Sequence, residues 1–292
     1  MHKIPVFFHI PRSGGTYLSN RIRGFFRLYL ARFCKTNPVV FTESRDSRYI
    51  FYKDQKIIAK MISVVRKSET VLTVFCLDRY SQNDQEYEKW EERTFLDRVQ
   101  ELDLFAIIVE PRQIRRNRSN LLKKISKKLS AELDFYAAIR EPSERLESLF
   151  FYLKSDMSSH EPTHKAYKAD SFEEFIINEA SEETGSWFSS QICWPNNISD
   201  NLFYKEVKVF LKKVKLFKLK NINTMISIAF LQNYGITGDA DIYSETFDSF
   251  NLTNKNLENC YLEKNNSKMS EDAKLKLKKI TKYDLEIFNA AF

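Results

Sequence analysis

Short apolar runs alternate along the chain with stretches in which apolar side chains recur every three or four residues. The first apolar run lies between Pro5 and Pro11, and it is followed by the glycine pair Gly14-Gly15. From about residue 16 to residue 33, apolar side chains return at helical spacing. The beginning of the chain therefore predicts a buried strand, a tight turn and an amphipathic helix.

The same alternation continues through the chain. Further apolar runs predict strands at residues 39–42, 71–77, 104–109, 135–139 and 214–219. Helices are predicted at residues 85–101, after Pro142, and at residues 172–179, 202–213, 225–234 and 270–292. Such alternation indicates an α/β fold, a three-layer sandwich with a central parallel sheet between helices. No repeat or low-complexity linker divides the chain, so we expect residues 1–292 to form one domain.

Composition favours a folded protein with an anionic partner. Hydrophobic residues make up 43% of the chain, and the formal net charge is +7 at pH 7. This charge suits a nucleotide, an anionic glycan, nucleic acid or a membrane surface. The four cysteines lie far apart and have no CxxC spacing, so we expect reduced thiols and no zinc site. No segment has the pattern of a secretory signal or a membrane span, which predicts a cytoplasmic protein.

The turn at residues 11–16 has the composition of a phosphate-binding loop. Its glycines allow an anion to approach the backbone N–H groups at the positive end of the following helix. Arg12 supplies a positive charge, and the hydroxyls of Ser13 and Thr16 can donate hydrogen bonds. The loop is shorter than GxxxxGK[ST], which disfavours a Walker ATPase. We expect a P-loop-like phosphate-binding turn; the alternative is an ordinary tight turn with an exposed arginine.

This loop resembles the 5′-phosphosulfate-binding motif of sulfotransferases that use 3′-phosphoadenosine 5′-phosphosulfate (PAPS), particularly the carbohydrate branch. The family's usual form is HIPKTGGTSL, and the matching residues here are His9, Ile10, Pro11, Arg12, Ser13, Gly14, Gly15, Thr16, Tyr17 and Leu18. Arg12 replaces a lysine, so it keeps the charge but cannot lose a proton as lysine can. The resemblance implies that residues 11–17 bind the phosphosulfate end of PAPS.

A second segment resembles the family's 3′-phosphate motif, in which an arginine follows a strand and a serine lies eight residues later. Arg140 and Ser148 occupy these positions. Two turns of helix after Pro142 can bring Ser148 back toward the phosphate that Arg140 binds. Arg145 completes the pattern RxPxxR, where a structural role is the alternative. This pattern is weak alone, but together with the first motif it strongly favours the PAPS-dependent family.

Weaker similarities extend through the second half of the chain. Gln191 lies where the family has an acceptor-side loop, and residues 214–235 resemble a later strand and helix. Ser267 and Lys268 precede the terminal helix, where the resemblance implies a loop that closes over the nucleotide.

Sulfuryl transfer requires alignment of the acceptor oxygen, stabilisation of the leaving phosphate and removal of the hydroxyl proton. Arg12 and the loop N–H groups can stabilise the phosphate, and this logic requires no metal. The family usually employs a histidine or glutamate as the base. Our first candidate is Glu110, for which pairing with a nearby arginine is an equally good interpretation. His160 and His164 lie in a polar segment and are further candidates, although loop histidines are more often solvated.

Other residues allow a second interpretation. His9 is expected to pack and shape the loop, and Glu43 and Asp78 are carboxylates at predicted strand ends. The basic run at residues 112–128 is either a solvated helix face or a cradle for an anionic acceptor or the nucleotide rim. Trp187, Phe188 and Trp194 could stack on sugar rings, although aromatic residues at such density are more often part of a core.

The sequence therefore predicts an enzyme that transfers a sulfuryl group from PAPS to a hydroxyl of a carbohydrate or another small molecule. Neither a nucleic-acid partner nor a membrane span is expected. Two alternatives stay open: a P-loop-like nucleotide kinase, which would need Mg²⁺ and ATP, and a non-catalytic basic module that binds nucleic acid.

Overall fold

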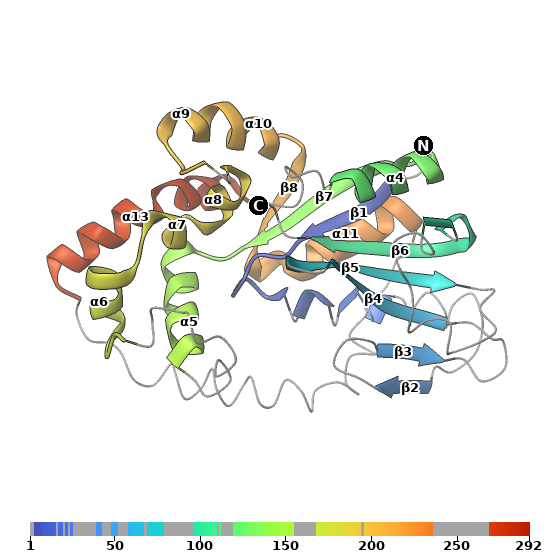
Figure 1. Ribbon diagram of the computed structural model, residues 1–292, viewed down its shortest axis with the longest axis horizontal. Helices are drawn as coiled ribbons and strands as arrows, with labels where there is room; N and C mark the ends of the chain where they lie inside the picture. Colours follow the sequence, from blue (N-terminus) through green and yellow to red (C-terminus); the bar gives the residue numbers. More distant parts are fainter. Residues whose placement is uncertain are drawn as a thin grey trace.

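A mixed eight-stranded sheet forms the centre of the computed structural model (Figure 1). The structure describes residues 3–15, 17–19, 21–22, 24–25, 39–42, 48–51, 58–66, 69–78, 96–97, 99–109, 111, 119–154, 168–193, 196–235 and 269–292. The strand order is β2-β3-β4-β5-β6-β1-β7-β8. Four neighbouring strands at one end run parallel, and they are β6 (Leu102–Val109), β1 (Lys3–Phe8), β7 (Glu132–Ile139) and β8 (Val214–Lys218).

The other end of the sheet is antiparallel. Its strands are β2 (Val39–Thr42), β3 (Arg48–Phe51), β4 (Ile58–Arg66) and β5 (Glu69–Asp78), and β5 pairs antiparallel with β6. Only residues 67 and 68 separate β4 from β5, which is a hairpin connection and too short for a parallel crossover. The prediction of an α/β fold is confirmed, but the expected parallel arrangement holds for four strands only.

Strand β1 is buried on both faces, as its continuous apolar sequence predicts. Val6 and Phe8 face one core cluster, and Phe7 faces another. The alternation follows from strand geometry, in which successive side chains point to opposite faces. The parallel part of the sheet therefore has a hydrophobic core on each side.

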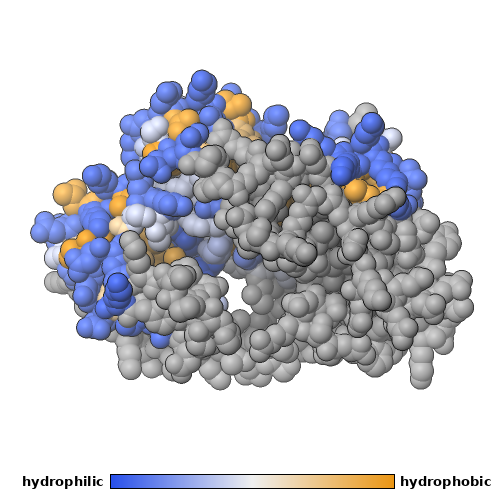
Figure 2. All heavy atoms as spheres, in the orientation of Figure 1, coloured by the Kyte–Doolittle hydropathy of each residue, from blue (hydrophilic) through white to orange (hydrophobic). Residues whose placement is uncertain are grey.

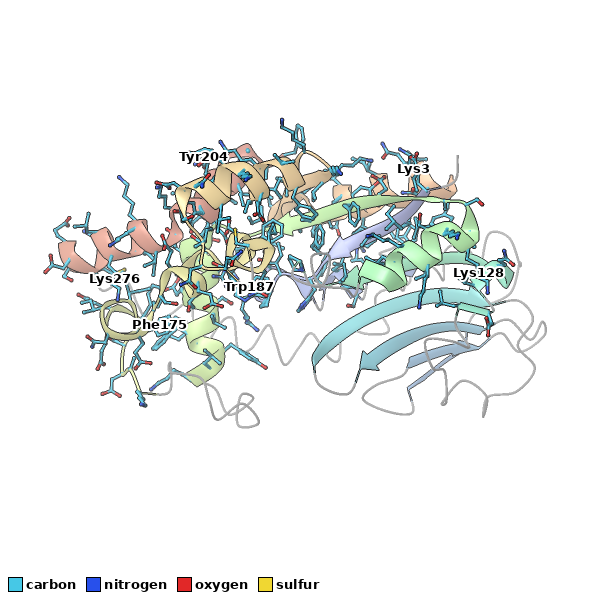
Figure 3. All side chains as sticks on the ribbon, turned by 45° about the horizontal axis from the view of Figure 1, so that its top comes forward. Lys3, Lys128, Phe175, Trp187, Tyr204 and Lys276 are labelled. Carbon is cyan, nitrogen blue, oxygen red and sulfur yellow. The ribbon has the colours of Figure 1, made fainter. Side chains whose placement is uncertain are left out.

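Helices cover the first face of the parallel strands. They are α4 (Ser119–Leu129), α8 (Trp187–Cys193), the π-helix η6 (Phe203–Val207), α10 (Lys208–Leu211) and α13 (Glu271–Ala290). Helix α4 is amphipathic: Leu122 and Ile125 are buried, whereas Lys123, Lys124 and Lys127 are exposed. Figure 3 shows Lys128 of α4 at the opposite end of the molecule from Lys276 of α13.

The second face packs against the first helix and α11 (Ile222–Tyr234). Described residues between 15 and 25 are helical, and Leu18, Ile22 and Phe25 are buried. Helix α11 follows the 3₁₀ turn η7 (Leu219–Asn221) and ends at Gly235, whose φ of 65° is left-handed. Gly235 caps the end of the helix, because its N–H donates hydrogen bonds to the carbonyls of Phe230 and Leu231.

A third core cluster lies beyond the carboxyl end of β7. It joins α5 (Pro142–Lys154), the segment α6 (Phe172–Glu174) with the π-helix η5 (Phe175–Glu179), and α13. The short helix α7 (Glu182–Gly185) also lies in this region, whereas α9 (Asp200–Leu202) packs with the first core cluster through Leu202. Helix α7 approaches α13 so closely that a Cβ on Gly185 would lie 2.6 Å from the Ile280 carbonyl oxygen. A side chain at position 185 would therefore push these two helices apart.

On the face shown in Figure 2, the described residues are mainly hydrophilic. Isolated apolar side chains such as Tyr204, Val209 and Leu275 are exposed, at 52%, 54% and 70%. Within the described helices, none combines the length and apolar character needed to cross a bilayer. Cys193, on α8, is buried.

Most predicted elements are present at the expected positions. The strands predicted near residues 6–10, 39–42, 71–77, 104–109, 135–139 and 214–219 correspond to β1, β2, β5, β6, β7 and β8. The helices predicted after Pro142 and near residues 225–234 and 270–292 correspond to α5, α11 and α13. Strands β3 and β4 were not predicted. Most of the predicted helix at 85–101 lies outside the described residues. Of its described part, residues 96–97 are helical, and η2 (Val99–Glu101) is a 3₁₀ turn.

Candidate functional site

The carboxyl ends of β1 and β7 bring the two sequence motifs together. The strands are parallel neighbours, and Phe8 at the end of β1 pairs with Ala137 of β7. The glycine loop follows β1, and Arg140 follows β7 directly. In parallel sheets, such loops at the carboxyl ends of strands are the usual place for ligand sites.

Two of the described residues in the glycine loop have a left-handed backbone conformation. Arg12 has a φ of 63° and Gly14 a φ of 81°. The Ser13 N–H donates to the Ile10 carbonyl over 3.1 Å, which closes the turn, and the Leu18 N–H donates to the Gly14 carbonyl over 2.8 Å, which begins the helix. A non-glycine residue in this region is uncommon, so the conformation at Arg12 must be held by its surroundings.

Both glycines are closely surrounded. A Cβ on Gly14 would lie 2.7 Å from the Leu219 side chain, and a Cβ on Gly15 would lie 2.3 Å from the His9 ring. His9 therefore packs on the loop, as expected for a residue that shapes it. The two glycines are required because neighbouring side chains fill the space that a larger residue would need.

Among the described polar side chains of the loop, Ser13 is the most buried. It is 4% exposed, and among the described residues its Oγ has no hydrogen-bond partner. A buried hydroxyl without a partner is uncommon in proteins and calls for an explanation. An anion held in the loop would supply the missing acceptor.

Arg12 connects the loop to α5. Its Nε donates a hydrogen bond of 3.1 Å to the Ser148 Oγ, and its guanidinium carbon lies 4.7 Å from the centre of the Tyr152 ring. Ser148 and Tyr152 are four residues apart and share one face of the helix. The contact joins one residue from each of the two predicted phosphate motifs.

Arg140 lies among the carboxylates of α5. Its Nε lies 3.4 Å from the Glu144 carboxylate, and the two side chains are 30% and 61% exposed. Burial raises the pKa of the neighbouring Glu147, the charge on Arg140 lowers it, and the charge on Glu144 raises it further. Glu144 therefore occupies Arg140 in the structure and would compete with an incoming anion.

Arg145 has a structural position rather than a binding one. It is 2% exposed and donates to the carbonyls of Thr184 and Gly185. Burial lowers its pKa, whereas the charge on Asp284 of α13 raises it. The burial of Arg145 therefore supports a structural role for the second arginine of the RxPxxR pattern.

Asp284 is the buried carboxylate that faces this arginine. It accepts hydrogen bonds of 2.9 Å from the Phe188 and Ser189 N–H groups, and one of 2.6 Å from the Ser189 hydroxyl. Burial raises the pKa of Asp284, while Arg145 and these hydrogen bonds lower it. The carboxylate caps the beginning of α8 and ties it to α13.

Of the remaining predicted site residues, some lie within the described part of the structure and others lie outside it. Tyr17 donates a 2.7 Å hydrogen bond to Asn223 of α11, and Gln191 is buried on α8 at 6% exposure. Trp187 is half-buried against the first core cluster. Six predicted residues lie outside the described residues, namely Thr16, Glu110, His160, His164, Ser267 and Lys268. Glu43 and Trp194 also lie outside them, and Asp78 ends β5.

Sequence reasoning did not single out Tyr152, Glu147 or Asp284. Tyr152 had one available signal, because it lies one helical turn beyond Ser148. Asp284 had no comparable signal, since its partners lie almost a hundred residues earlier in the chain.

Comparisons of the chain with protein-family models, with curated proteins and with solved structures give no match. Within the described residues, no three histidine, cysteine, aspartate or glutamate side chains are grouped so that they could hold a metal ion.

Proposed function

We propose that the chain is a sulfotransferase that transfers a sulfuryl group from PAPS to a hydroxyl of an acceptor. The observation that carries the proposal is the hydrogen bond between Arg12 and Ser148. It places the loop that resembles the 5′-phosphosulfate motif against the helix that resembles the 3′-phosphate motif. A donor with phosphate groups at both its 3′ and 5′ positions requires two such anion sites close together.

The loop has the features that a bound phosphate needs, which supports its assignment as a P-loop-like turn. Gly14 and Gly15 keep side chains away from the backbone, and the buried Ser13 hydroxyl has no acceptor among the residues that the structure describes. The first helix begins at the loop, so its N-terminal N–H groups add donors and a favourable dipole. Arg12 adds a fixed positive charge beside them.

In the proposed reaction, the acceptor oxygen forms a bond to sulfur while the bond from sulfur to the 5′-phosphate oxygen breaks. Arg12 stabilises the negative charge that develops on the departing phosphate. Arg140 and Ser148 hold the 3′-phosphate and so fix the donor in place. The hydroxyl proton passes to a base, for which Glu110, His160 and His164 are the candidates. The proposal needs no metal ion.

The proposed acceptor is a carbohydrate or another small molecule with a hydroxyl group. This follows from the loop sequence, which resembles the carbohydrate branch of the family most closely. The basic character of the chain fits an acceptor that is itself anionic.

The first test is isothermal titration calorimetry with adenosine 3′,5′-bisphosphate, the nucleotide product of the reaction. We expect one site per chain, with affinity reduced at least tenfold by Arg12→Ala and by Arg140→Ala. Lys278→Ala is the matched control, because it removes a positive charge from an exposed position on α13. We expect this control to bind like the wild type.

Two other results would contradict the proposal. Binding of ATP only in the presence of Mg²⁺, without binding of the bisphosphate, would favour a nucleotide kinase. Steeply salt-dependent binding of DNA or RNA that survives Arg12→Ala and Ser148→Ala would favour a nucleic-acid-binding module. If the bisphosphate binds as expected, transfer of labelled sulfate from PAPS to a panel of glycans and small alcohols then identifies the acceptor.

A further inference from the structure

Helix α5 presents two different contacts to one arginine. Ser148 accepts a hydrogen bond from Arg12 Nε over 3.1 Å, and the Tyr152 ring lies under the guanidinium at 4.7 Å. A hydrogen bond alone would let the guanidinium turn about the Nε–H direction. The aromatic face limits that rotation, because a guanidinium over a ring is held by its planar face.

The backbone of Arg12 makes such support necessary. Its φ of 63° is a backbone conformation that residues other than glycine rarely adopt. The long arginine side chain has many rotamers, and it must adopt a particular one to bind an anion, which costs conformational entropy. Two contacts on neighbouring turns of α5 select that rotamer before the anion arrives.

We propose that Tyr152 is a positioning residue that holds the plane of the Arg12 guanidinium for the 5′-phosphate end of the nucleotide. The inference rests on the proposed function, and it gives the tyrosine a role that acts through the arginine. It also gives a reason for arginine at position 12, because a planar guanidinium stacks on a ring in a fixed orientation, whereas a lysine ammonium is a point charge.

Tyr152→Leu and Tyr152→Phe test the proposal in calorimetry with two ligands. Leucine keeps apolar bulk against the neighbouring core cluster but removes the ring, whereas phenylalanine keeps the ring. We expect Tyr152→Leu to weaken adenosine 3′,5′-bisphosphate binding about two- to thirtyfold, the range of a cation–π contact. Tyr152→Phe should bind within about twofold of the wild type. Adenosine 3′-monophosphate, which lacks the 5′-phosphate, should bind all three proteins equally.

The Arg12→Ala background separates positioning from general damage to the fold. If the tyrosine acts through Arg12, adding Tyr152→Leu to Arg12→Ala should cause no further loss of affinity. Thermal unfolding of each variant checks folding, and Tyr152→Met is a second ring-free variant if the leucine variant does not fold.

Three results would overturn the inference while leaving the proposed function intact. They are unchanged bisphosphate binding by Tyr152→Leu, an equal loss with Tyr152→Phe, or a loss that persists in the Arg12→Ala background. Failure of the wild-type chain to bind the bisphosphate at all would instead overturn both proposals.

Discussion

A methyl group added at Gly15 tests the packing of the glycine loop directly. The Cβ of Gly15→Ala would lie 2.3 Å from both the Cδ2 and the Nε2 of His9, whereas carbon atoms in van der Waals contact lie about 3.5–4.0 Å apart. The ring or the loop must therefore move by more than an ångström. Overpacking of this kind destabilises proteins by roughly 1–3 kcal/mol.

A second effect of the substitution has the opposite sign. Replacing glycine by alanine restricts the unfolded chain, which stabilises a protein by about 0.4–1 kcal/mol where the native backbone tolerates alanine. Gly15 has no positive φ, so this gain applies once the obstruction is removed. We therefore expect Gly15→Ala to lower the free energy of unfolding by up to about 2.5 kcal/mol, and to raise it slightly in a His9→Ala background.

Urea unfolding of the wild type, both single variants and the double variant measures this coupling, which should reach about 1–3 kcal/mol. Gly14→Ala is the control: its Cβ would meet Leu219 at 2.7 Å and its φ is 81°, so His9→Ala should not rescue it. Additive effects of Gly15→Ala and His9→Ala, within about 0.5 kcal/mol, would show that the ring does not fill the space beside the loop.

Three other substitutions probe the capped carboxylate, the second motif and the end of α11. Asp284→Ala leaves Arg145 buried without a counter-charge, so the free energy of unfolding should fall by about 3–5 kcal/mol; a loss below about 1 kcal/mol in urea unfolding would argue against an ionised pair. Glu144→Gln frees Arg140 from a carboxylate 3.4 Å away, and calorimetry should show bisphosphate affinity rising roughly two- to fivefold; weaker binding would contradict competition. A Cβ at Gly235 would meet no atom of the described residues within 4 Å, but the φ of Gly235 is 65°, so backbone strain in Gly235→Ala should lower stability by about 1 kcal/mol, with Asn tolerated better. An unchanged midpoint of thermal unfolding would contradict this.

The elements that the sequence predicted best are those whose pattern comes from local geometry. Strand β1 is buried on both faces and therefore has a continuous apolar run, and α11 and α13 each bury a face and therefore have apolar residues at helical spacing. Both patterns can be read from the sequence. Strands β3 and β4 were not predicted, although Tyr49, Ile50 and Phe51 form a short apolar run in β3, and β4 is apolar apart from Lys60, Ser63 and Arg66. The two residues between β4 and β5 are Lys67 and Ser68, which are not a typical hairpin turn sequence, so the connection gave no turn signal.

The meeting of Arg12 and Ser148 could be anticipated because both follow neighbouring parallel strands. The cation–π contact of Arg12 with Tyr152 could not, because it depends on the rotamer of the Arg12 side chain and the tilt of α5. The burial of Arg145 depends on contacts with residues far later in the chain, so its sequence motif alone could not separate it from Arg140. The roles of Glu110, His160 and His164 stay predictions.

Helix α5 packs against α13, which follows it late in the sequence. Ile280 of α13 packs in the same cluster as Leu146 and Phe150 of α5, and the charge on Asp284 acts on Arg145. During synthesis, both phosphate motifs leave the ribosome long before α13 does. The nascent chain would therefore carry both phosphate motifs before α13 could pack on α5, the helix that presents Ser148 and Tyr152.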